Sequence, residues 1–401
     1  MGKSLDGKEL GRGIVQRKSG VYYGRAVVRG RKIEIYNHSL SELRKELELA
    51  KAKALTEEKA SAVKEYTLSE WFEEYFNSYK RPSLKTETSA AAYYRKVKNT
   101  YISILGDCKI NNVSHLDIQN ATNELIENKK YTVRTVKEAL GVLKSCFEIG
   151  VMNSIVKINP CIRINIKNEN QAIPERRVLD EYELKVFLEE IRGDYYEEAY
   201  KILLSTGMRI GEFSSLRWSD IMWDKKCIKI QRSMSVGYLD GKRILDIVPP
   251  KTAKAYREIP FFGETEELLK SWKKKQDIYK KKLGDRWRGL PEHGDLVFTT
   301  TFGSACTRYV LVHSIEKITK NINEKEEYRA AIEGREPHYF EHIHPHAFRH
   351  TFATLCFMKQ MNPLVVQRIL GHARYDQTMS YTHLLDNKRQ EEVEKVGNFL
   401  E

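Results

Sequence analysis

Two arginines in the C-terminal half of the 401-residue chain stand in settings suited to phosphate chemistry. Arg209 lies in the segment TGMRIGE, where a glycine interrupts two apolar helical runs and exposes the amides of a helix N-terminus. Glu212, one turn later, is placed to hold Arg209 or a neighbouring group. Arg349 lies in HPHAFRHT, and His346 precedes it by one helical turn, so both side chains face the same side. Because a phosphodiester is protected by its anionic oxygens, clustered guanidinium groups favour its opening without a metal ion.

Further along the chain, a histidine and a tyrosine complete a candidate site. In NPLVVQRILGH, Pro363 suits the first helical position and Gly371 the C-terminal cap, which predicts that His372 projects beyond the helix end. Tyr381 follows nine residues later, between polar residues. A tyrosine hydroxyl has a pKa of about 10, so it needs a base, for which His346 is a candidate, and a cationic site to attack at neutral pH. The alternative interpretation of Tyr381 is a packed aromatic side chain, because the chain has 22 tyrosines.

The charge of the chain suits a polyanionic partner. Lysine and arginine number 68 against 55 acidic residues, which gives a formal net charge of +13. Residues 1–64 alone carry 15 of these basic residues against 8 acidic ones. Charge of this kind also occurs on surfaces that are merely solvated, so it favours nucleic acid without proving it.

Cysteine usage and hydropathy indicate the cellular setting. The six cysteines are scattered and form no C-x-x-C pair, which is typical of reduced thiols. The N-terminal segment MGKSLDGKELGRG lacks the apolar core of a secretory signal, and no stretch approaches the roughly 18 apolar residues of a membrane span. We therefore expect a protein without a membrane segment that meets DNA in the cytoplasm.

The elements that must position these residues fall into three predicted domains. Residues 1–64 are expected to form a small basic β-sheet, with strands at 21–28 and 32–36, backed by a helix that a capping box at Ser39 and Glu42 begins. Such a sheet could lie in a DNA groove, and the alternative is an ordinary α+β appendage.

Residues 65–168 are predicted to be entirely helical. A capping box at Thr67 and Glu70 opens the first helix, and periodic apolar residues predict others at 114–128 and 132–151. Residues 168–177, mostly polar and containing a proline, are typical of a linker.

Residues 169–401 are predicted to form a mainly α-helical domain with a small antiparallel sheet. Asp180 and Glu183 begin a helix, another runs through 199–204, and strands are expected at 227–231 and 243–248. The prolines and Lys251 in PPKT predict a turn, with 257–260 returning as the second arm of a hairpin.

Taken in chain order, T-G-x-R-x-x-E, a lysine at a turn, H-x-x-R, L-G-H and the tyrosine resemble the catalytic domain of the tyrosine recombinases, the family of phage and conjugative-transposon integrases. The resemblance covers roughly residues 178–385. The helical segment is similar to the family's SAM-like core-binding domain, and residues 1–64 are similar to its arm-type DNA-binding domains in position, size and charge. The resemblance implies a multidomain α+β protein.

The resemblance also implies a role for each residue of the site. Arg209 and Arg349 would grip the scissile phosphate, and His346 and His372 would hydrogen-bond to it, with His346 a plausible general base. Tyr381 would be the nucleophile that forms a 3′-phosphotyrosine.

The general acid is the least certain of these roles. The resemblance implies that Lys251 protonates the departing 5′ oxygen, with Lys254 the alternative. The phosphotyrosine ester conserves the bond energy, so rejoining needs no ATP, and we find no phosphate-binding loop of the G-x-x-x-x-G-K-[ST] type. No cofactor and no metal are expected.

The implied partners are double-stranded DNA at core and arm sites and three further copies of the chain, which form a homotetramer on DNA. Excision factors and DNA-bending proteins are possible accessories, and integration and excision of a mobile element is the implied role. The tail, residues 386–401, has an apolar edge that in relatives docks onto a neighbouring subunit, and its alternative is a frayed helix.

Four other readings compete with this one. A chromosomal or plasmid resolvase of the same family would share every motif, and a type IB topoisomerase uses similar arginine, lysine and tyrosine chemistry. A DNA-binding regulator would keep the basic modules and lose catalytic residues. A metal hydrolase is suggested by the histidines at positions 338, 342, 344, 346 and 350, although no H-E-x-x-H motif occurs.

Overall fold

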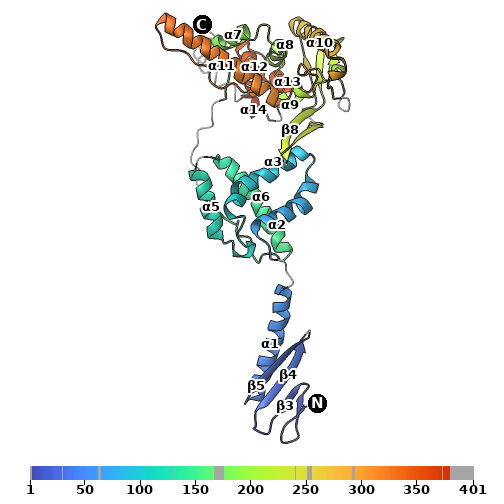
Figure 1. Ribbon diagram of the computed structural model, residues 1–401, viewed down its shortest axis with the longest axis vertical. Helices are drawn as coiled ribbons and strands as arrows, with labels where there is room; N and C mark the ends of the chain where they lie inside the picture. The colour runs from blue at the N-terminus through green and yellow to red at the C-terminus, as the bar shows by residue number, and fades with distance from the viewer. Residues whose placement is uncertain are drawn as a thin grey trace, which may run out of the picture. The chain divides into compact units, whose positions relative to one another are not determined.

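The structure is a computed structural model, and it describes residues 2–28, 30–61, 65–128, 130–166, 176–239, 241–250, 255–290, 294–372 and 374–379. Contacts divide the chain into two compact units (Figure 1). The first comprises Met1–Lys85 and Tyr93–Asn168, and the second comprises Thr86–Ala92 and Glu169–Glu401. In the described part of the chain, no helix is both long enough and apolar enough to cross a membrane.

The N-terminal part of the first unit is a sheet with one helix against it (Figure 1). Its antiparallel strands have the order β3 (Ile14–Gln16), β4 (Tyr22–Val28), β5 (Arg31–Asn37), and a short pair, β1 (Gly2–Lys3) and β2 (Glu9–Gly11), precedes them. Helix α1 (Leu40–Ser61) buries Leu43 and Leu47 against the sheet. The predicted strands, and the helix beginning after Ser39, are therefore confirmed. Strands β1 to β3 were not predicted, because two or three residues are too few to display alternation.

The rest of the first unit is helical, as predicted. Its α-helices are α2 (Leu68–Tyr75), α4 (Ser103–Leu105), α5 (His115–Glu127), α6 (Val133–Met152) and the part of α3 (Glu87–Val97) from Tyr93 onward. It also has π-helical turns at Phe76–Lys80 and Lys98–Ile102 and 3₁₀ turns at Arg81–Ser83 and Ile110–Asn112. The capping box predicted at Thr67 and Glu70 is present. Trp71 locks α2 to α6, because its buried indole N–H donates to the Cys146 carbonyl at 3.1 Å.

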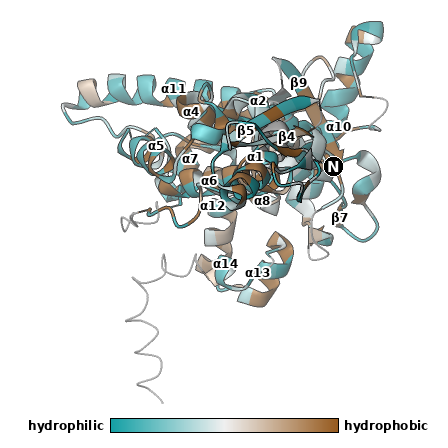
Figure 2. Ribbon diagram, turned by 90° about the horizontal axis from the view of Figure 1, so that it is seen from below, coloured by the Kyte–Doolittle hydropathy of each residue, from teal (hydrophilic) through white to brown (hydrophobic). Residues whose placement is uncertain are grey.

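The second unit packs most of its helices around one large apolar core, and a smaller apolar cluster joins the end of α12 to α13. The helices are α7 (Glu181–Glu190), α8 (Glu197–Thr206), α9 (Ile210–Ser214), α10 (Gly263–Leu283), α11 (Arg308–Glu333), α12 (Pro345–Met358), α13 (Pro363–Leu370) and α14 (Asp376–Met379), with 3₁₀ turns at Trp218–Asp220 and Gly284–Arg286. Fully buried Phe187, Tyr200 and Phe348 join α7, α8 and α12 at the centre of this core. The predicted capping box at Asp180 is present. Helix α11 is mainly hydrophilic (Figure 2).

The strands of the second unit form two separate antiparallel groups. One is a three-stranded sheet with the order β10 (Arg257–Pro260), β7 (Cys227–Ile230), β6 (Ile221–Met222), and the other is a hairpin of β8 (Ser233–Leu239) and β9 (Lys242–Val248). Our prediction of a hairpin between 243–248 and 257–260 is therefore wrong. Asp240-Gly241 lies between β8 and β9, and this dipeptide is the strongest local signal for a tight hairpin. Pro249 and Pro250, which lack amide hydrogens, end that ladder, and β10 pairs with β7 instead.

Candidate active site

Arg209 stands at the junction of two helices. Gly207 ends α8 in a left-handed conformation, with φ of +58°, and Arg209 is the N-terminal cap of α9. The Glu212 carboxylate accepts hydrogen bonds from the Arg209 backbone N–H and from its Nη1, both at 2.9 Å. The predicted role of Glu212 as a holder of Arg209 is confirmed. The arginine side chain stays one-third exposed, so it can reach a ligand.

Arg349 is almost completely buried in the first turns of α12, with 4% of its surface exposed. Its Nη1 donates to the Gly207 carbonyl at 2.8 Å, and its Nη2 donates to the Leu370 carbonyl at 2.6 Å. The guanidinium therefore joins the ends of α8 and α13. As predicted, His346 lies one turn earlier in the same helix.

Three arginines converge on the last carbonyl groups of α13. Gly371 caps this helix in a left-handed conformation, and Pro363 begins it, both as predicted. The carbonyl oxygens of Ile369, Leu370 and Gly371 accept in turn from Arg257 Nε, Arg349 Nη2 and Arg209 Nη2. A helix C-terminus carries partial negative charge, which these cations complement. Arg209 and Arg349, far apart in sequence, are thereby brought together.

His372 follows this arginine-bound turn directly. It is 8% exposed, and its Nδ1 lies 2.8 Å from the Thr378 hydroxyl. Burial, together with the charges of Arg349 and Arg209, lowers its pKa to about 3. The ring is therefore neutral at physiological pH, and the Thr378 contact fixes its orientation.

His346 lies beside the same cations. Its side chain keeps a solvent-exposed face, while the atoms packed around it remove part of its hydration. This burial, followed by the charges of Arg349 and nearby His344, lowers its pKa to about 4. The ring of His350 meets it edge-on, with the ring centroids 5.7 Å apart. A neutral imidazole at neutral pH can accept a proton, which is what a general base requires.

Arg209 and His346 also line a common pocket of about 310 Å³. Its walls come from the start of α9, from β8 and from the start of α11, where Thr307 and Arg308 lie. Two cations and a neutral imidazole thus border one hollow that an anionic group can enter.

A buried ion pair supports these residues, and sequence reasoning missed half of it. Arg257 on β10 binds both Glu212 carboxylate oxygens, at 2.8 and 2.9 Å, and the two side chains are only 6% and 4% exposed. Burial alone would raise the pKa of Glu212, but hydrogen bonds from Arg257 and the charges of Arg257 and Arg209 lower it to about 2. No local signal identifies Arg257, because its partners come from distant segments.

Two predicted catalytic residues lie outside the described residues. These are Lys251 and Tyr381, together with the alternative acid Lys254 and the tail 386–401. The remaining four, Arg209, His346, Arg349 and His372, lie within them and gather around the end of α13.

The histidine-rich segment before α12 bears on the metal-hydrolase reading. Among the residues that the structure describes, no group of three or more His, Cys, Asp or Glu side chains is arranged to hold a metal ion. His346 contacts His350 through their rings.

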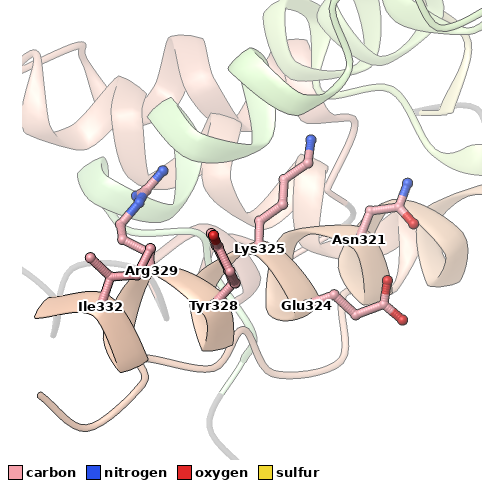
Figure 3. Close-up of a pocket in the computed structure, with 6 residues that line it drawn as sticks. All are labelled: Asn321, Glu324, Lys325, Tyr328, Arg329 and Ile332. Atoms are coloured by element: carbon pink, nitrogen blue, oxygen red, sulfur yellow. The ribbon is translucent and has the colours of Figure 1, made fainter. Parts of the chain in front are cut away.

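A second, more open hollow lies along α11 (Figure 3). Its volume is about 710 Å³, and its lining residues are Asn321, Glu324, Lys325, Tyr328, Arg329 and Ile332. They repeat at helical spacing along one side of α11, and none of them was predicted to take part in chemistry.

Comparisons with known proteins identify the family of this chain. Residues 177–388 match the model of the phage integrase family, and residues 67–126 match that of the SAM-like N-terminal domain of phage integrases. A "tyrosine recombinase XerC-like" protein of Caldanaerobacter subterraneus subsp. tengcongensis is 27% identical over 341 residues, which are 82% of this chain and 81% of the relative. The ICEBs1 integrase of Bacillus subtilis is 26% identical over 294 residues, 73% of this chain and 72% of the relative.

The fold has a solved counterpart. A structure of the Tn1549 transposon integrase in complex with a circular intermediate DNA aligns with a TM-score of 0.59 and 21% identity, covering 79% of this chain and 94% of that one. The predicted fold class is confirmed by this likeness. Because the family model spans more than half of its residues, the chain belongs to the phage integrase family, the tyrosine recombinases that cut and rejoin DNA.

Proposed function

We propose that this recombinase integrates and excises a mobile genetic element, and that Tyr381 is its nucleophile. The observation that carries the proposal is the meeting of Arg209 and Arg349 on neighbouring carbonyl groups beside His372. Two fixed cations next to neutral imidazoles suit a phosphodiester, whose charge grows on the nonbridging oxygens during attack. The similarity to the ICEBs1 integrase and to the transposase from transposon Tn916 favours a mobile element.

In the proposed reaction, the Tyr381 hydroxyl oxygen attacks the scissile phosphorus. The new bond is a 3′-phosphotyrosine ester, and the bond that breaks is the one to the 5′ oxygen of the next nucleotide. The tyrosine proton passes to His346, which accepts it as a neutral ring. Lys251 gives a proton to the departing 5′ oxygen, with Lys254 as the alternative donor. Attack by a second 5′ hydroxyl reverses each step and joins new strands.

Each of the three segments has a different role on DNA. We assign residues 1–64 to arm-type sites, residues 65–168 to core sites and residues 169–401 to catalysis. Support comes from the family matches to the second and third segments and from the basic charge of the first. We place the reaction in the cytoplasm, where the six cysteines, all free thiols in the structure, remain reduced.

The acting species is proposed to be four copies on two paired DNA sites, with accessory excision or DNA-bending proteins. The resemblance to integrases supports this assembly, which exchanges one strand from each duplex at a time. A topoisomerase would instead relax supercoiled DNA without pairing sites. Recombinant products from two separate duplexes that carry the element's ends and its insertion site therefore distinguish the two activities.

The nucleophile is tested with a nicked suicide substrate, in which the cleaved fragment diffuses away and traps the covalent adduct. Wild type is expected to form a protein–DNA adduct that survives denaturation and forms equally in EDTA. Tyr381→Phe is expected to form none, because it lacks the attacking oxygen. Tyr375→Phe is the matched control, since Tyr375 is a nearby tyrosine with 42% of its surface exposed. An adduct in Tyr381→Phe would refute the assigned nucleophile.

A further inference from the structure

The structure assigns a positioning role in strand cleavage to Arg257, an inference that rests on the proposed function. Arg257 lies on β10, its side chain is 6% exposed, and its three guanidinium nitrogens all donate to protein acceptors, so we assign it no contact with DNA. Its guanidinium binds the two oxygens of Glu212, the Ile369 carbonyl and, at 3.3 Å, the Ala255 carbonyl. It therefore binds Glu212, which holds Arg209, and the Ile369 carbonyl at the same helix end to which Arg209 donates.

The first argument is geometric. Glu212 Oε1 accepts from Arg209 Nη1 and from Arg257 Nη1, each at 2.9 Å, so one oxygen is shared between the two arginines. At the other side, Arg257 binds the Ile369 carbonyl and Arg209 binds the Gly371 carbonyl of the same turn. Arg257 thus sets the distance between the start of α9 and the turn that carries His372.

The second argument is electrostatic. Glu212 is a buried carboxylate beside Arg209, and alone it would neutralise the charge that Arg209 offers to phosphate. Arg257 supplies a second positive charge to the same carboxylate. Two arginines around one carboxylate leave a net positive charge, so the charge of Arg209 remains available to the DNA.

The third argument is steric. A Cβ at Gly371 would lie 2.9 Å from Arg257 Cδ and 3.0 Å from its Nη1, so the turn before His372 packs directly on this side chain. Lysine has no planar fork and cannot bind both oxygens of Glu212 together with the Ile369 carbonyl. Arg257→Lys therefore keeps the charge and removes the geometry, whereas Arg257→Gln removes both.

The test is the single-turnover cleavage rate of the full-length protein on the nicked suicide substrate. We expect a loss of about 10-fold in Arg257→Lys and about 100-fold in Arg257→Gln, the size of effect that misplaced catalytic groups produce. DNA affinity should stay unchanged. Arg335→Lys is the matched control, because Arg335, which follows the end of α11, binds the buried Glu326 at 2.6 Å and has no part in these contacts. It should cleave at the wild-type rate.

Modified substrates separate positioning from a general loss of structure. A methylphosphonate at the scissile position is neutral and depends less on surrounding cations, so the defect of Arg257→Gln should shrink. A 5′-bridging phosphorothiolate leaves without a general acid, and here the defect should persist. Wild-type cleavage in both variants, or a defect that vanishes on the phosphorothiolate, would overturn the positioning role. Wild type that forms no adduct would instead refute the proposed function. If Arg257→Gln does not fold, Arg257→Lys decides.

Discussion

Arginines serve two regions of this molecule in opposite ways. At the end of α13, Arg349 is 4% exposed and binds backbone carbonyl groups with both terminal nitrogens. On the N-terminal sheet, exposed Arg17 lies over the rings of Tyr23 and Tyr36, at 5.0 and 4.9 Å, and donates to the Tyr36 hydroxyl at 3.2 Å. The Arg349 guanidinium is held in place by the fold, whereas the Arg17 guanidinium is exposed to solvent.

This difference in burial separates arginines that affect the rate of cleavage from arginines that affect the strength of DNA binding. A buried cation with its position fixed in advance stabilises a developing charge without reorganising, and removing it leaves buried partners unpaired. An exposed cation over an aromatic ring contributes about 0.5–1 kcal/mol and is screened by salt. Substitutions in the first region should therefore change the rate of cleavage, and those in the second should change only the strength of binding.

The largest expected effect belongs to Arg349→Lys. A lysine cannot bind the Gly207 and Leu370 carbonyl groups together, so the junction loses a fixed donor and, in the proposed mechanism, the scissile phosphate loses one too. We expect single-turnover cleavage to fall about 10²–10³-fold, as for loss of one donor to a developing oxyanion. Arg17→Lys, the matched change in the other region, should leave the rate unaltered on core-site DNA. A loss of less than tenfold in Arg349→Lys would contradict the claim that buried, fixed arginines control the rate of cleavage.

The next largest effect is expected when either of two glycines is replaced by alanine, and it is measured as a loss in the free energy of unfolding. Gly207 has φ of +58°, and a Cβ there would lie 2.2 Å from the Phe352 ring. Gly20, in the N-terminal sheet region, has φ of +84° with nothing within 4 Å of such a Cβ. We expect Gly207→Ala to destabilise by about 2–4 kcal/mol, from backbone strain and overpacking, and Gly20→Ala by about 1 kcal/mol. Urea denaturation measures both, and equal values would contradict the steric argument.

The contrast between the regions also explains what sequence could predict. The cap residues Thr67 and Asp180, the first-turn proline Pro363 and the glycines at positions 207 and 371 act through neighbours a few residues away. Their patterns therefore predicted the helix ends correctly. The four described site residues were predicted because the family resemblance uses the order of the motifs along the chain as well as the local pattern around each residue.

Long-range partners escaped prediction. Arg257 carries no periodic or capping signal, and its hydrogen bonds go to Glu212 and Ile369, which tertiary packing alone brings near. The same cause led us to pair β10 with the wrong strand. Strand pairing depends on which edge remains open after the β8–β9 hairpin forms, and a local turn signal at 249–252 does not contain that information.

The histidines predict how the catalytic unit responds to pH. An unfolded histidine has a pKa near 6.5, whereas burial and the neighbouring arginines lower those of His372 and His346 to about 3 and 4. Between pH 6.5 and 4 the unfolded state therefore binds more protons, and stability falls as pH falls. At pH 5, about 1.5 pH units below the unfolded pKa, buried His372 alone lowers the free energy of unfolding by about 2 kcal/mol, so we expect Tm to drop by about 4–8 °C between pH 7 and 5 from this residue. His372→Gln should reduce this drop, and an unchanged slope in that variant would contradict the assignment.

The smallest expected effect is that of Arg17→Gln on the N-terminal sheet. Its guanidinium contacts two tyrosine rings and keeps one face exposed, which suits a single phosphate contact. We expect affinity for arm-site DNA to fall about 3- to 10-fold and the slope of log affinity against log salt to decrease by about 1. Fluorescence anisotropy over a salt series measures both quantities, and cleavage of core-site DNA serves as the internal control. If Arg17→Gln slowed cleavage on core DNA while arm affinity stayed the same, the sheet would belong with the chemistry, and the division between fixed and hydrated arginines would be lost.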